Sequence, residues 1–360
     1  AIDNASAGDE IILSAGTFNE NIIIDKSLTL SGSGTNTIIT VQPPFGMGSP
    51  PLSDWTLPGI NVTAEDVTIS NLAISNFTTG ILTYGADSLD LQYVSIKHIQ
   101  GIGLHIRESE DVNVHEMIVA YSELSNIIVE NNSTDMTISD STIGWSEESG
   151  VIVREGSDFF EMQGVTVNMN EDYGCFLASN NAIISDSTIH NNGLNGIYVQ
   201  SIRGVTLSDN AFTGNGLAEV RTMTSYDITI ENNYFNATDP EGGGWGIDTS
   251  GSSEFEIDDN SFELGLRLIN GDNFTISNNE FSNITYGNNY EQKTSILIDG
   301  NDNIISDNVI TNVGIALVFL NDADYNMVEN NIISSTSVSD IEYYTSGRNN
   351  TFISTEIDTV

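Results

Sequence analysis

The chain has 360 residues and a formal net charge of −42, because 51 Asp and Glu stand against 9 Lys and Arg. Hydrophobic residues make up 39% of the chain, which is enough for a packed core and excludes a disordered polyanion. The negative field excludes unassisted binding of nucleic acid, and no apolar stretch approaches the roughly 18 residues that a membrane span needs. Scarce lysine and abundant aspartate favour a saline or calcium-containing environment.

The chain begins at Ala1 without an initiator Met, so we expect a mature or excised segment of an extracellular or cell-surface protein. Its single cysteine, Cys175, forms no internal disulfide and matches no zinc pattern. Asn-x-Ser/Thr sequons make it a candidate glycoprotein, although such triplets also arise by chance in this composition. The candidate acceptors are Asn61, Asn76, Asn132, Asn236, Asn273 and Asn283.

In chain order, residues 1–41 predict an N-terminal cap and the first turns of structure. Residues 42–59 hold five of the six prolines and predict an insertion. From residue 60 to residue 360 the chain is repetitive, with loops predicted at 236–246 and 285–295. We therefore predict a single domain over residues 1–360, built from repeats.

The repeat is a short element in which apolar positions alternate with Thr and Ser, as in Val67–Ile74 and Met136–Ile143. Its central aliphatic residues span 259 residues in eleven steps, a mean period of about 23.5 residues that is typical of solenoids. These residues are Ile69, Leu91, Val114, Ile138, Met162, Ile184, Leu207, Ile230, Ile257, Ile276, Ile305 and Val328.

Each period carries a second strand signal, Gly-apolar-x-apolar, as in Gly103–Ile106 and Gly196–Val199. No segment shows a sustained helical period, so strands without crossover helices must stack as coils of a parallel β-solenoid. Equivalent positions then form rows with a spacing of about 4.8 Å. One such row is a run of asparagines that tolerate a left-handed corner and bond amide to amide, a purely structural role. Its members are Asn210, Asn233, Asn260, Asn279, Asn308 and Asn331.

The opening segment, AIDNASAGDEIILSAGTFNENIIIDKSLTLSG, resembles the first coils of the pectin-lyase-like right-handed β-helix superfamily. It is most similar to the NosD-like, carbohydrate-binding-and-sugar-hydrolase branch, whose repeats are known as PbH1 repeats. The resemblance implies an all-β fold, a right-handed single-stranded parallel β-helix, with Ala1–Ala5 as the remnant of a capping helix. Such proteins include lyases, hydrolases, epimerases, adhesins and surface-layer proteins, so function must be argued from a site.

The outward positions of the second strand are the most informative surface. They carry four of the six arginines and several aromatic residues in a protein with few cations. An anionic polysaccharide fits this face, because Arg clamps carboxylates or sulfates and rings pack against sugars. The predicted ligand-binding residues are Tyr84, Arg107, Arg154, Phe176 and Arg267 on the face, with Trp145 and Trp245 at the corner that walls it.

A plainer interpretation is a salt-bridge row, in which Arg107, Glu130 and Arg154 neutralise one another in successive coils. The aliphatic stripe of Ile128, Ile152 and Phe176 fits an oligomer contact equally well.

Catalytic signals are few. A lyase or epimerase acting on a uronate needs a cation beside the carboxylate and a base near C5, and the residue types of His105, Tyr198 and Arg221 meet this need. The Asp motifs of polygalacturonase-like hydrolases and of the alginate epimerase branch are missing from the sequence. If the protein is an enzyme, a lyase or epimerase is therefore favoured over a hydrolase.

No cofactor is required by any motif, and the one candidate is Ca²⁺. Acidic turns follow the second strand at Glu108–Asp111, at Asp299 with Asp302 and at Asp322 with Asp324. Oxygen-rich turns of this kind hold Ca²⁺ in some proteins, but Asx turns form without an ion.

Three functions remain from the sequence. The first is a secreted or cell-surface protein that binds polysaccharide, and the second is a uronate lyase or epimerase. The third is a structural protein that associates with itself or with other surface proteins in a layer or filament.

Overall fold

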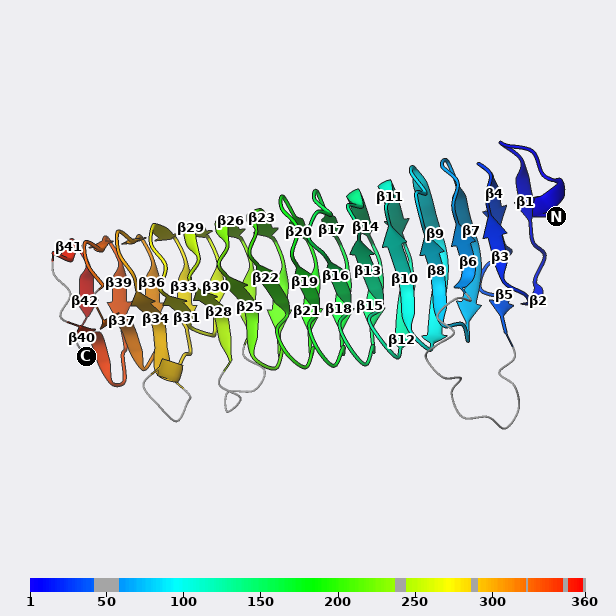
Figure 1. Ribbon diagram of the computed structural model, residues 1–360. Helices are drawn as coiled ribbons and strands as arrows, with labels where there is room; N and C mark the ends of the chain where they lie inside the picture. Colours follow the sequence, from blue (N-terminus) through cyan, green and yellow to red (C-terminus); the bar gives the residue numbers. More distant parts are fainter. Residues whose placement is uncertain (42–57, 237–243, 286–290, 322, 346–348, 359–360) are drawn as a thin grey trace. The chain divides into compact units, whose positions relative to one another are not determined.

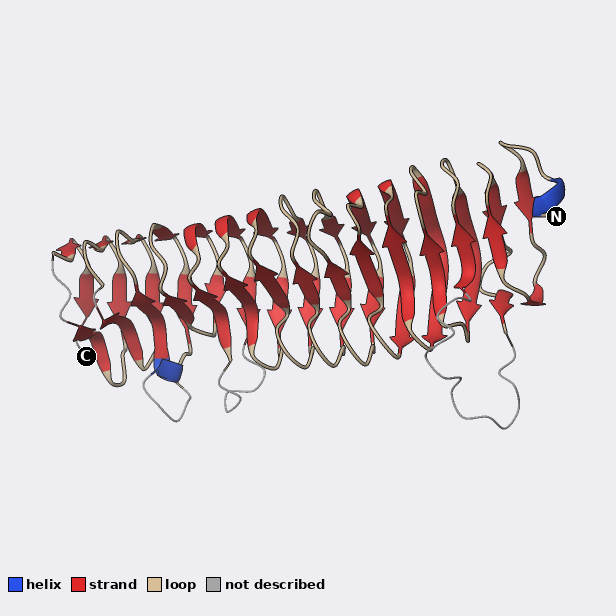
Figure 2. Cartoon of the chain, viewed as in Figure 1, coloured by secondary structure: helices blue, strands red, loops and turns tan. Residues whose placement is uncertain are grey.

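The computed structural model describes residues 1–41, 58–236, 244–285, 291–321, 323–345 and 349–358 (Figure 1). The chain divides into two compact units, Ala1–Ala182 and Ile183–Val360. Almost every element in either unit is a β-strand, as Figure 2 shows. The helices of the described residues are two short 3₁₀ turns, η1 (Ile2–Asn4) and η2 (Glu291–Lys293). The first lies where the remnant of a capping helix is predicted.

Each unit is a stack of coils, and a coil contributes its first strands to one sheet, here sheet A, and its last strand to another, sheet B. In the first unit, sheet A consists of β1 (Glu10–Ile12), β2 (Gly16–Asn19), β4 (Thr29–Ser31), β5 (Thr37–Thr40), β7 (Thr68–Ser75), β9 (Leu89–Ile99), β11 (Glu110–His115), β12 (Ile118–Ser122), β14 (Thr134–Ser139), β15 (Thr142–Gly144), β17 (Glu161–Gln163) and β18 (Thr166–Asn168). Sheet B of this unit consists of β3 (Ile22–Ile24), β6 (Pro58–Val62), β8 (Thr79–Thr83), β10 (Ile102–Arg107), β13 (Ile127–Glu130), β16 (Val151–Val153) and β19 (Cys175–Leu177).

The second unit repeats this plan. Its sheet A strands are β20 (Ile183–Ser185), β21 (Thr188–His190), β23 (Arg203–Ser208), β24 (Ala211–Thr213), β26 (Tyr226–Glu231), β27 (Tyr234–Asn236), β29 (Ser253–Asp258), β30 (Ser261–Phe262), β32 (Phe274–Ser277), β33 (Glu280–Ser282), β35 (Ile304–Ser306), β36 (Val309–Thr311), β38 (Met327–Glu329), β39 (Ile332–Ser334), β41 (Thr351–Ile353) and β42 (Glu356–Asp358). Its sheet B strands are β22 (Ile197–Gln200), β25 (Ala218–Met223), β28 (Trp245–Ser250), β31 (Leu266–Ile269), β34 (Thr294–Asp299), β37 (Ile315–Asn321) and β40 (Ser339–Thr345).

The register confirms the predicted repeat. Strands pair in parallel with the same strand of the next coil, so Ile69 faces Leu91 and Val114 faces Ile138 in the first unit. In the second unit Leu207 faces Ile230, and Ile276 faces Ile305. These aliphatic side chains are buried and form the core of each unit. The prediction of a parallel β-solenoid is therefore confirmed, whereas the prediction of a single domain remains untested.

The predicted boundaries change in detail. Residues 42–57 of the predicted insertion lie outside the described residues, but Pro58 and Gly59 begin β6. Residues 237–243 and 286–290 of the predicted loops also lie outside them, whereas Trp245 opens β28 and Thr294 opens β34. In the part of the chain that the structure describes, no helix has the length and apolar character needed to cross a membrane.

The asparagine row lies inside the second unit. The side-chain amide of every member before Asn331 donates to the side-chain amide oxygen of the Asn in the next coil, for example from Asn210 Nδ2 to Asn233 Oδ1 at 3.0 Å. The left-handed corner is one residue earlier than predicted: Asp209 and Asn232, with φ of 56° for both, take the positive φ. The buried Asn therefore satisfies backbone groups inside the corner.

Glu219 is an exception to this apolar and amide-rich interior. It lies in β25, is 2% exposed, and accepts hydrogen bonds from the side chain and backbone N–H of Asn215. Burial raises the pKa of its carboxyl to about 7, and the hydrogen bonds from Asn215 and Gly214 oppose this rise. The protonated form is thus the better suited to the folded chain.

We predict that Glu219 makes folding pH-dependent. Because its folded pKa lies above the unfolded value of 4.5, its contribution to the free energy of unfolding is greatest below pH 4.5 and is lost as the pH rises through about 7. The loss amounts to roughly 3 kcal/mol. In urea unfolding at pH 4, 6 and 8, the free energy of unfolding of Glu219→Gln should increase relative to that of the wild type as the pH rises. Glu280→Gln, at an exposed position of β33, is the control, and parallel curves for wild type and Glu219→Gln would contradict the assignment.

Candidate functional site

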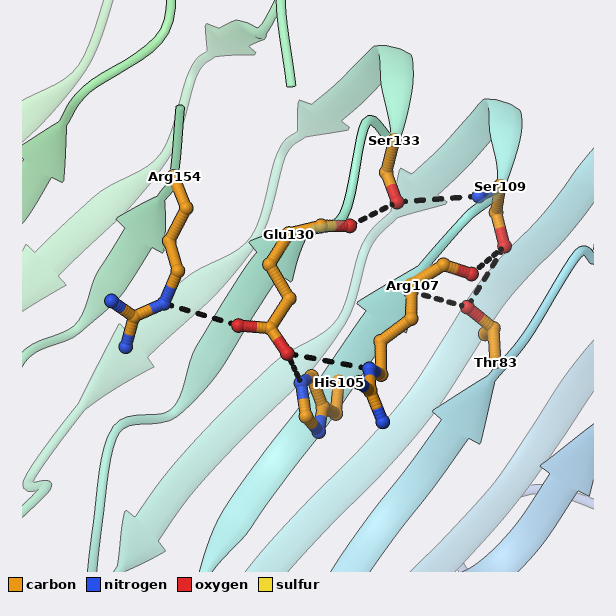
Figure 3. Close-up of polar contacts among 7 residues, drawn as sticks. All are labelled: Thr83, His105, Arg107, Ser109, Glu130, Ser133 and Arg154. Carbon is orange, nitrogen blue, oxygen red and sulfur yellow. Dashed lines mark hydrogen bonds and ion pairs between the residues drawn. The ribbon is translucent and has the colours of Figure 1, made fainter. Parts of the chain in front are cut away.

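Sheet B presents alternating side chains in the first unit, as predicted. In β10 the side chains of Leu104 and Ile106 are completely buried, while His105 and Arg107 point outward and are partly exposed. The register places Arg107 beside Glu130 of β13, and Arg154 directly follows β16 in the next coil. The four polar side chains therefore meet on the outer surface of sheet B (Figure 3).

Glu130 is the centre of this group, called here the Glu130 cluster (His105, Arg107, Glu130, Arg154). Its Oε1 lies 3.0 Å from Nε2 of His105 and 3.3 Å from Nε of Arg107. Its Oε2 lies 3.1 Å from Nε of Arg154. Arg107 contacts Glu130 as an ion pair without hydrogen-bond geometry. One carboxylate thus serves two guanidinium groups, so the cluster retains a net positive charge.

A row of buried hydroxyl groups fixes the backbone under the cluster. Ser109 Oγ donates to the carbonyl of Arg107, and Ser133 Oγ donates to the carbonyl of Glu130, at 2.9 and 2.8 Å. Thr83 Oγ1 accepts from the backbone N–H of Arg107. Because these hydroxyls are at most 1% exposed, the corner that carries the charged residues is held from inside (Figure 3).

The surroundings of His105 favour the neutral form of its imidazole. Burial lowers the pKa of its imidazole, Glu130 opposes this, and the positive charges of Arg107 and Arg154 add to it. A carboxylate only accepts hydrogen bonds, so Nε2 of the neutral ring donates to Glu130 and Nδ1 keeps a lone pair. The arrangement orients an imidazole base, and the carboxylate stabilises the imidazolium that forms when Nδ1 takes a proton.

A second cluster of the same design lies in the second unit and is called the Asp248 cluster (Arg221, Asp248, Arg267). The three residues occupy equivalent positions of β25, β28 and β31. Arg221 forms an ion pair with Oδ2 of Asp248, and Nε of Arg267 lies 3.2 Å from Oδ1. Burial raises the pKa of the Asp248 carboxyl, and both arginines oppose this rise. The next equivalent positions are Leu297 and Val318, which are buried, so the charged row ends at Arg267.

The predicted salt-bridge row is therefore present, and it coexists with an excess of cations. Sequence reasoning named Arg107, Glu130 and Arg154 as mutual partners but missed that Asp248 joins Arg221 to Arg267. The signal was available, because Asp248 stands at the same outward position of the repeat.

The other predicted site residues are scattered. Tyr84 is half exposed beside Arg107, and a hydrogen bond from its hydroxyl to Glu108 raises its pKa. Phe176 is partly buried on β19 and packs against Tyr173 with ring centroids 6.0 Å apart. Tyr198 of β22 neighbours Arg221, and its hydroxyl lies 3.6 Å from Sδ of Met223. His105 and Tyr198 belong to different units, so the predicted catalytic residues divide between the two clusters.

The two tryptophans have different environments. Trp245 is 9% exposed and packs in an apolar cluster with Ala218, Leu297 and Ile315, and its role in binding stays a prediction. Trp145 lies at the corner before β16 and stacks on Tyr121.

Two further predictions concern modification and metal. Among the sequons, Asn76, Asn132, Asn273 and Asn283 are exposed, whereas Asn61 and Asn236 are partly buried, and glycosylation stays a prediction. In the described residues no group of three or more His, Cys, Asp or Glu side chains is placed to hold a metal ion. Asp322, a predicted Ca²⁺ ligand, lies outside the described residues.

Comparison with known proteins identifies the fold of the chain. The family model described as a right handed beta helix region matches residues 125–264. No curated protein matches the sequence. The chain is similar to the A-module of mannuronan C-5 epimerase AlgE6 from Azotobacter vinelandii, with 15% identity, a TM-score of 0.54, and coverage of 98% of this chain and 91% of that one.

Two other solved structures are similar. Alginate lyase AlyF-OU02 has 13% identity and a TM-score of 0.60, with 84% of this chain and 80% of that chain covered. The GH87 alpha-1,3-glucanase of Streptomyces thermodiastaticus has 12% identity and a TM-score of 0.59, with 99% and 64% covered. At such identities the likeness concerns the fold alone, which is the predicted right-handed parallel β-helix.

We predict that removing the charge of Glu130 lowers the pKa of His105 further. The carboxylate favours the imidazolium, whereas burial and the two arginines disfavour it, so Glu130→Gln leaves only the disfavouring influences. An NMR titration of the imidazole protons would measure this shift. Glu161→Gln on sheet A is the control, and an unchanged or raised pKa in Glu130→Gln would show that the carboxylate does not govern the ring.

Proposed function

We propose that the protein engages an anionic polysaccharide through the outer face of sheet B, with the Glu130 and Asp248 clusters as its points of contact. The observation that carries this proposal is that each cluster shares one carboxylate between two arginines. In a chain with a net charge of −42, each cluster is a local site of positive charge. Arg107, Arg154 and Arg267 are paired through Nε, so their terminal nitrogens are left for a second acid group, whereas Arg221 is paired through one of its terminal nitrogens.

The geometry suits a carboxylate or sulfate of a sugar chain. Glu130 and Asp248 hold the arginine side chains before a ligand arrives, which lowers the entropy cost of binding. The arginine side chains are partly exposed, between 30% and 52%, so the terminal nitrogens remain accessible to a polymer. Two of the similar proteins are a mannuronan C-5 epimerase and an alginate lyase, which supports a polysaccharide ligand. An extracellular or cell-surface location fits this ligand.

A second function, a lyase or epimerase reaction on a uronate, is favoured by the geometry of His105. His105 projects from the arginine-bearing face, and its contact with Glu130 through Nε2 leaves Nδ1 as the nitrogen that can accept a proton. In such a reaction an arginine pairs with the uronate carboxylate, and Nδ1 takes the proton from C5. The electron pair of the C5–H bond then forms a C4–C5 double bond, and the C4–O bond breaks with its electron pair on the departing oxygen, which takes a proton from water. In epimerisation C5 instead regains a proton from water on the other side, and in either case the imidazolium returns its proton to solvent.

We predict that the arginines of the Glu130 cluster determine affinity for anionic polysaccharide. The double variant Arg107→Ala/Arg154→Ala should bind alginate, polygalacturonate or heparin about tenfold or more weakly at low salt, because a charge-assisted pair is lost at each site. Binding by the wild type should weaken as salt rises. Isothermal titration calorimetry with defined oligosaccharides measures both effects.

Two controls separate binding from scaffold electrostatics. Arg203→Ala removes a positive charge from sheet A and should leave the affinity nearly unchanged. Glu130→Gln removes one negative charge while its amide oxygen still accepts from an arginine, so the gain in electrostatic attraction should outweigh the partial loss of side-chain order and tighten binding of the anion. If the arginines serve only the fold, these variants change the unfolding midpoint, and none of them selectively alters affinity.

We predict that any eliminating activity depends on His105. His105→Gln should abolish the absorbance of unsaturated uronate, while affinity for the polymer, measured separately, stays within a few fold of wild type. Tyr198→Phe and Arg221→Ala test the second unit in the same assay. Activity that survives His105→Gln at the wild-type rate would remove this residue from the mechanism, and wild-type protein without product would leave binding alone as the function.

A further inference from the structure

A row of aromatic side chains lies away from the arginine face, in the same coils of the first unit. They occupy equivalent positions at the end of the sheet A part of each coil: His98 is near the end of β9, Tyr121 is near the end of β12, and Trp145 directly follows β15. The rings of His98 and Tyr121 stack with centroids 5.0 Å apart, and those of Tyr121 and Trp145 with centroids 5.4 Å apart. The interplanar angles are 13° and 21°. Of this aromatic row, sequence reasoning had identified only Trp145.

The backbone conformation at these positions is unfavourable for aromatic residues. His98, Tyr121 and Trp145 have φ of 55°, 61° and 57°, in the left-handed region that costs a residue with a side chain roughly 1–2 kcal/mol. Asn76 and Asn191 take the same corner in other coils of their units, with the residue type that tolerates it best. Burial does not offset the cost, because Tyr121 is 44% and Trp145 37% exposed. The same corner is taken by Met169 in the next coil, so it is not restricted to Asn, and stacking of the three rings offsets part of the cost. Their exposed surface is the part that burial does not explain.

A hollow of about 370 Å³ runs beside the aromatic row. Gln100, Glu123 and Glu147 line it together with the three aromatic residues. The buried residues Ile99 and Ser122 also contribute to its lining. Lys and Arg are absent from the described residues that line it, so the hollow has the opposite electrostatic character to the Glu130 cluster.

Aromatic rings and carboxylates line the hollow, and their hydrogen-bonding groups define the ligand. Stacked rings cover each other's faces and expose their edges, where imidazole, phenol and indole carry polar N–H or O–H groups. The carboxylates of Glu123 and Glu147 accept hydrogen bonds only. Sugar hydroxyls both donate and accept hydrogen bonds, so they suit the ring edges as well as the carboxylates, whereas an acidic sugar is repelled by Glu123 and Glu147. The spacing of coils, about 4.8 Å, repeats these groups at a distance close to the length of one sugar ring.

We propose that this hollow binds a neutral, hydroxyl-rich stretch of polysaccharide. The inference rests on the proposed engagement of polysaccharide and adds a second subsite with a different preference. The hollow lies where the chain enters β10, β13 and β16, whereas the Glu130 cluster lies where it leaves them. A polymer that combines acidic and neutral sugars meets both subsites on the same three coils.

The test is calorimetric titration of the full chain with cellohexaose, mannohexaose and β-1,4-galactohexaose. At least one of these neutral hexasaccharides should bind, and Tyr121→Ala should weaken it about tenfold, because its ring edge and its stacking support are both lost. Glu147→Gln should weaken binding several-fold, since hydroxyls bond more strongly to a carboxylate than to an amide. The matched control is Tyr93→Ala, at a residue with φ of 56°, 46% exposure and a ring contact to His115.

The outcomes separate this inference from the proposed function. If neutral hexasaccharide binding weakens in Tyr121→Ala and Glu147→Gln but not in Tyr93→Ala, the neutral subsite is supported. No binding of any neutral hexasaccharide, or equal loss in both tyrosine variants, overturns it. The variant Arg107→Ala/Arg154→Ala should retain neutral binding while losing anionic binding. If anionic binding is lost there and no neutral sugar binds, the subsite fails and the arginine face stands.

Discussion

Parallel hydrogen bonding between successive coils is the constraint on which the rest of each unit depends. Because a strand pairs in register with the same strand of the next coil, each repeat position becomes a row with a spacing of about 4.8 Å. A row of one residue type then acts as a unit. Asparagines bond amide to amide, and in the second unit Phe212, Phe235 and Phe262 stack with centroids 5.0 and 4.5 Å apart. Surface chemistry is subject to the same geometry.

On such a row, like charges in adjacent coils repel, so charged residues must alternate in sign. The Glu130 and Asp248 clusters obey this rule, and each ends with an arginine on both sides of one acid. The salt-bridge interpretation and the binding interpretation therefore describe the same contacts. The acid that relieves repulsion also holds the guanidinium groups in place, and the excess positive charge is left for a ligand.

The Glu130 cluster and the hollow beside the aromatic row use opposite ends of the same strands. At the corner before β10, β13 and β16, rings and carboxylates offer groups for hydroxyls, and beyond the same strands arginines offer groups for anions. A rigid β-helix keeps such groups at a fixed distance from one another, which suits a polymer with a regular repeat better than a small molecule. If a polymer binds as proposed, the asymmetry of charge along each strand gives the bound polymer a direction.

The sequence by itself determined the fold, because a period of about 23.5 residues without helical segments leaves stacked coils as the one way to bury its aliphatic positions. It also determined which side chains face outward, since alternation along a strand fixes the face, as His105 and Arg107 show. Only the tertiary structure decided which groups pair across coils. The diagonal contact of His105 with Glu130, the burial of Trp245 and the stacking of His98 on Tyr121 depend on register and corner geometry. Those quantities are set by pairing between residues more than twenty positions apart, which a local sequence pattern does not encode.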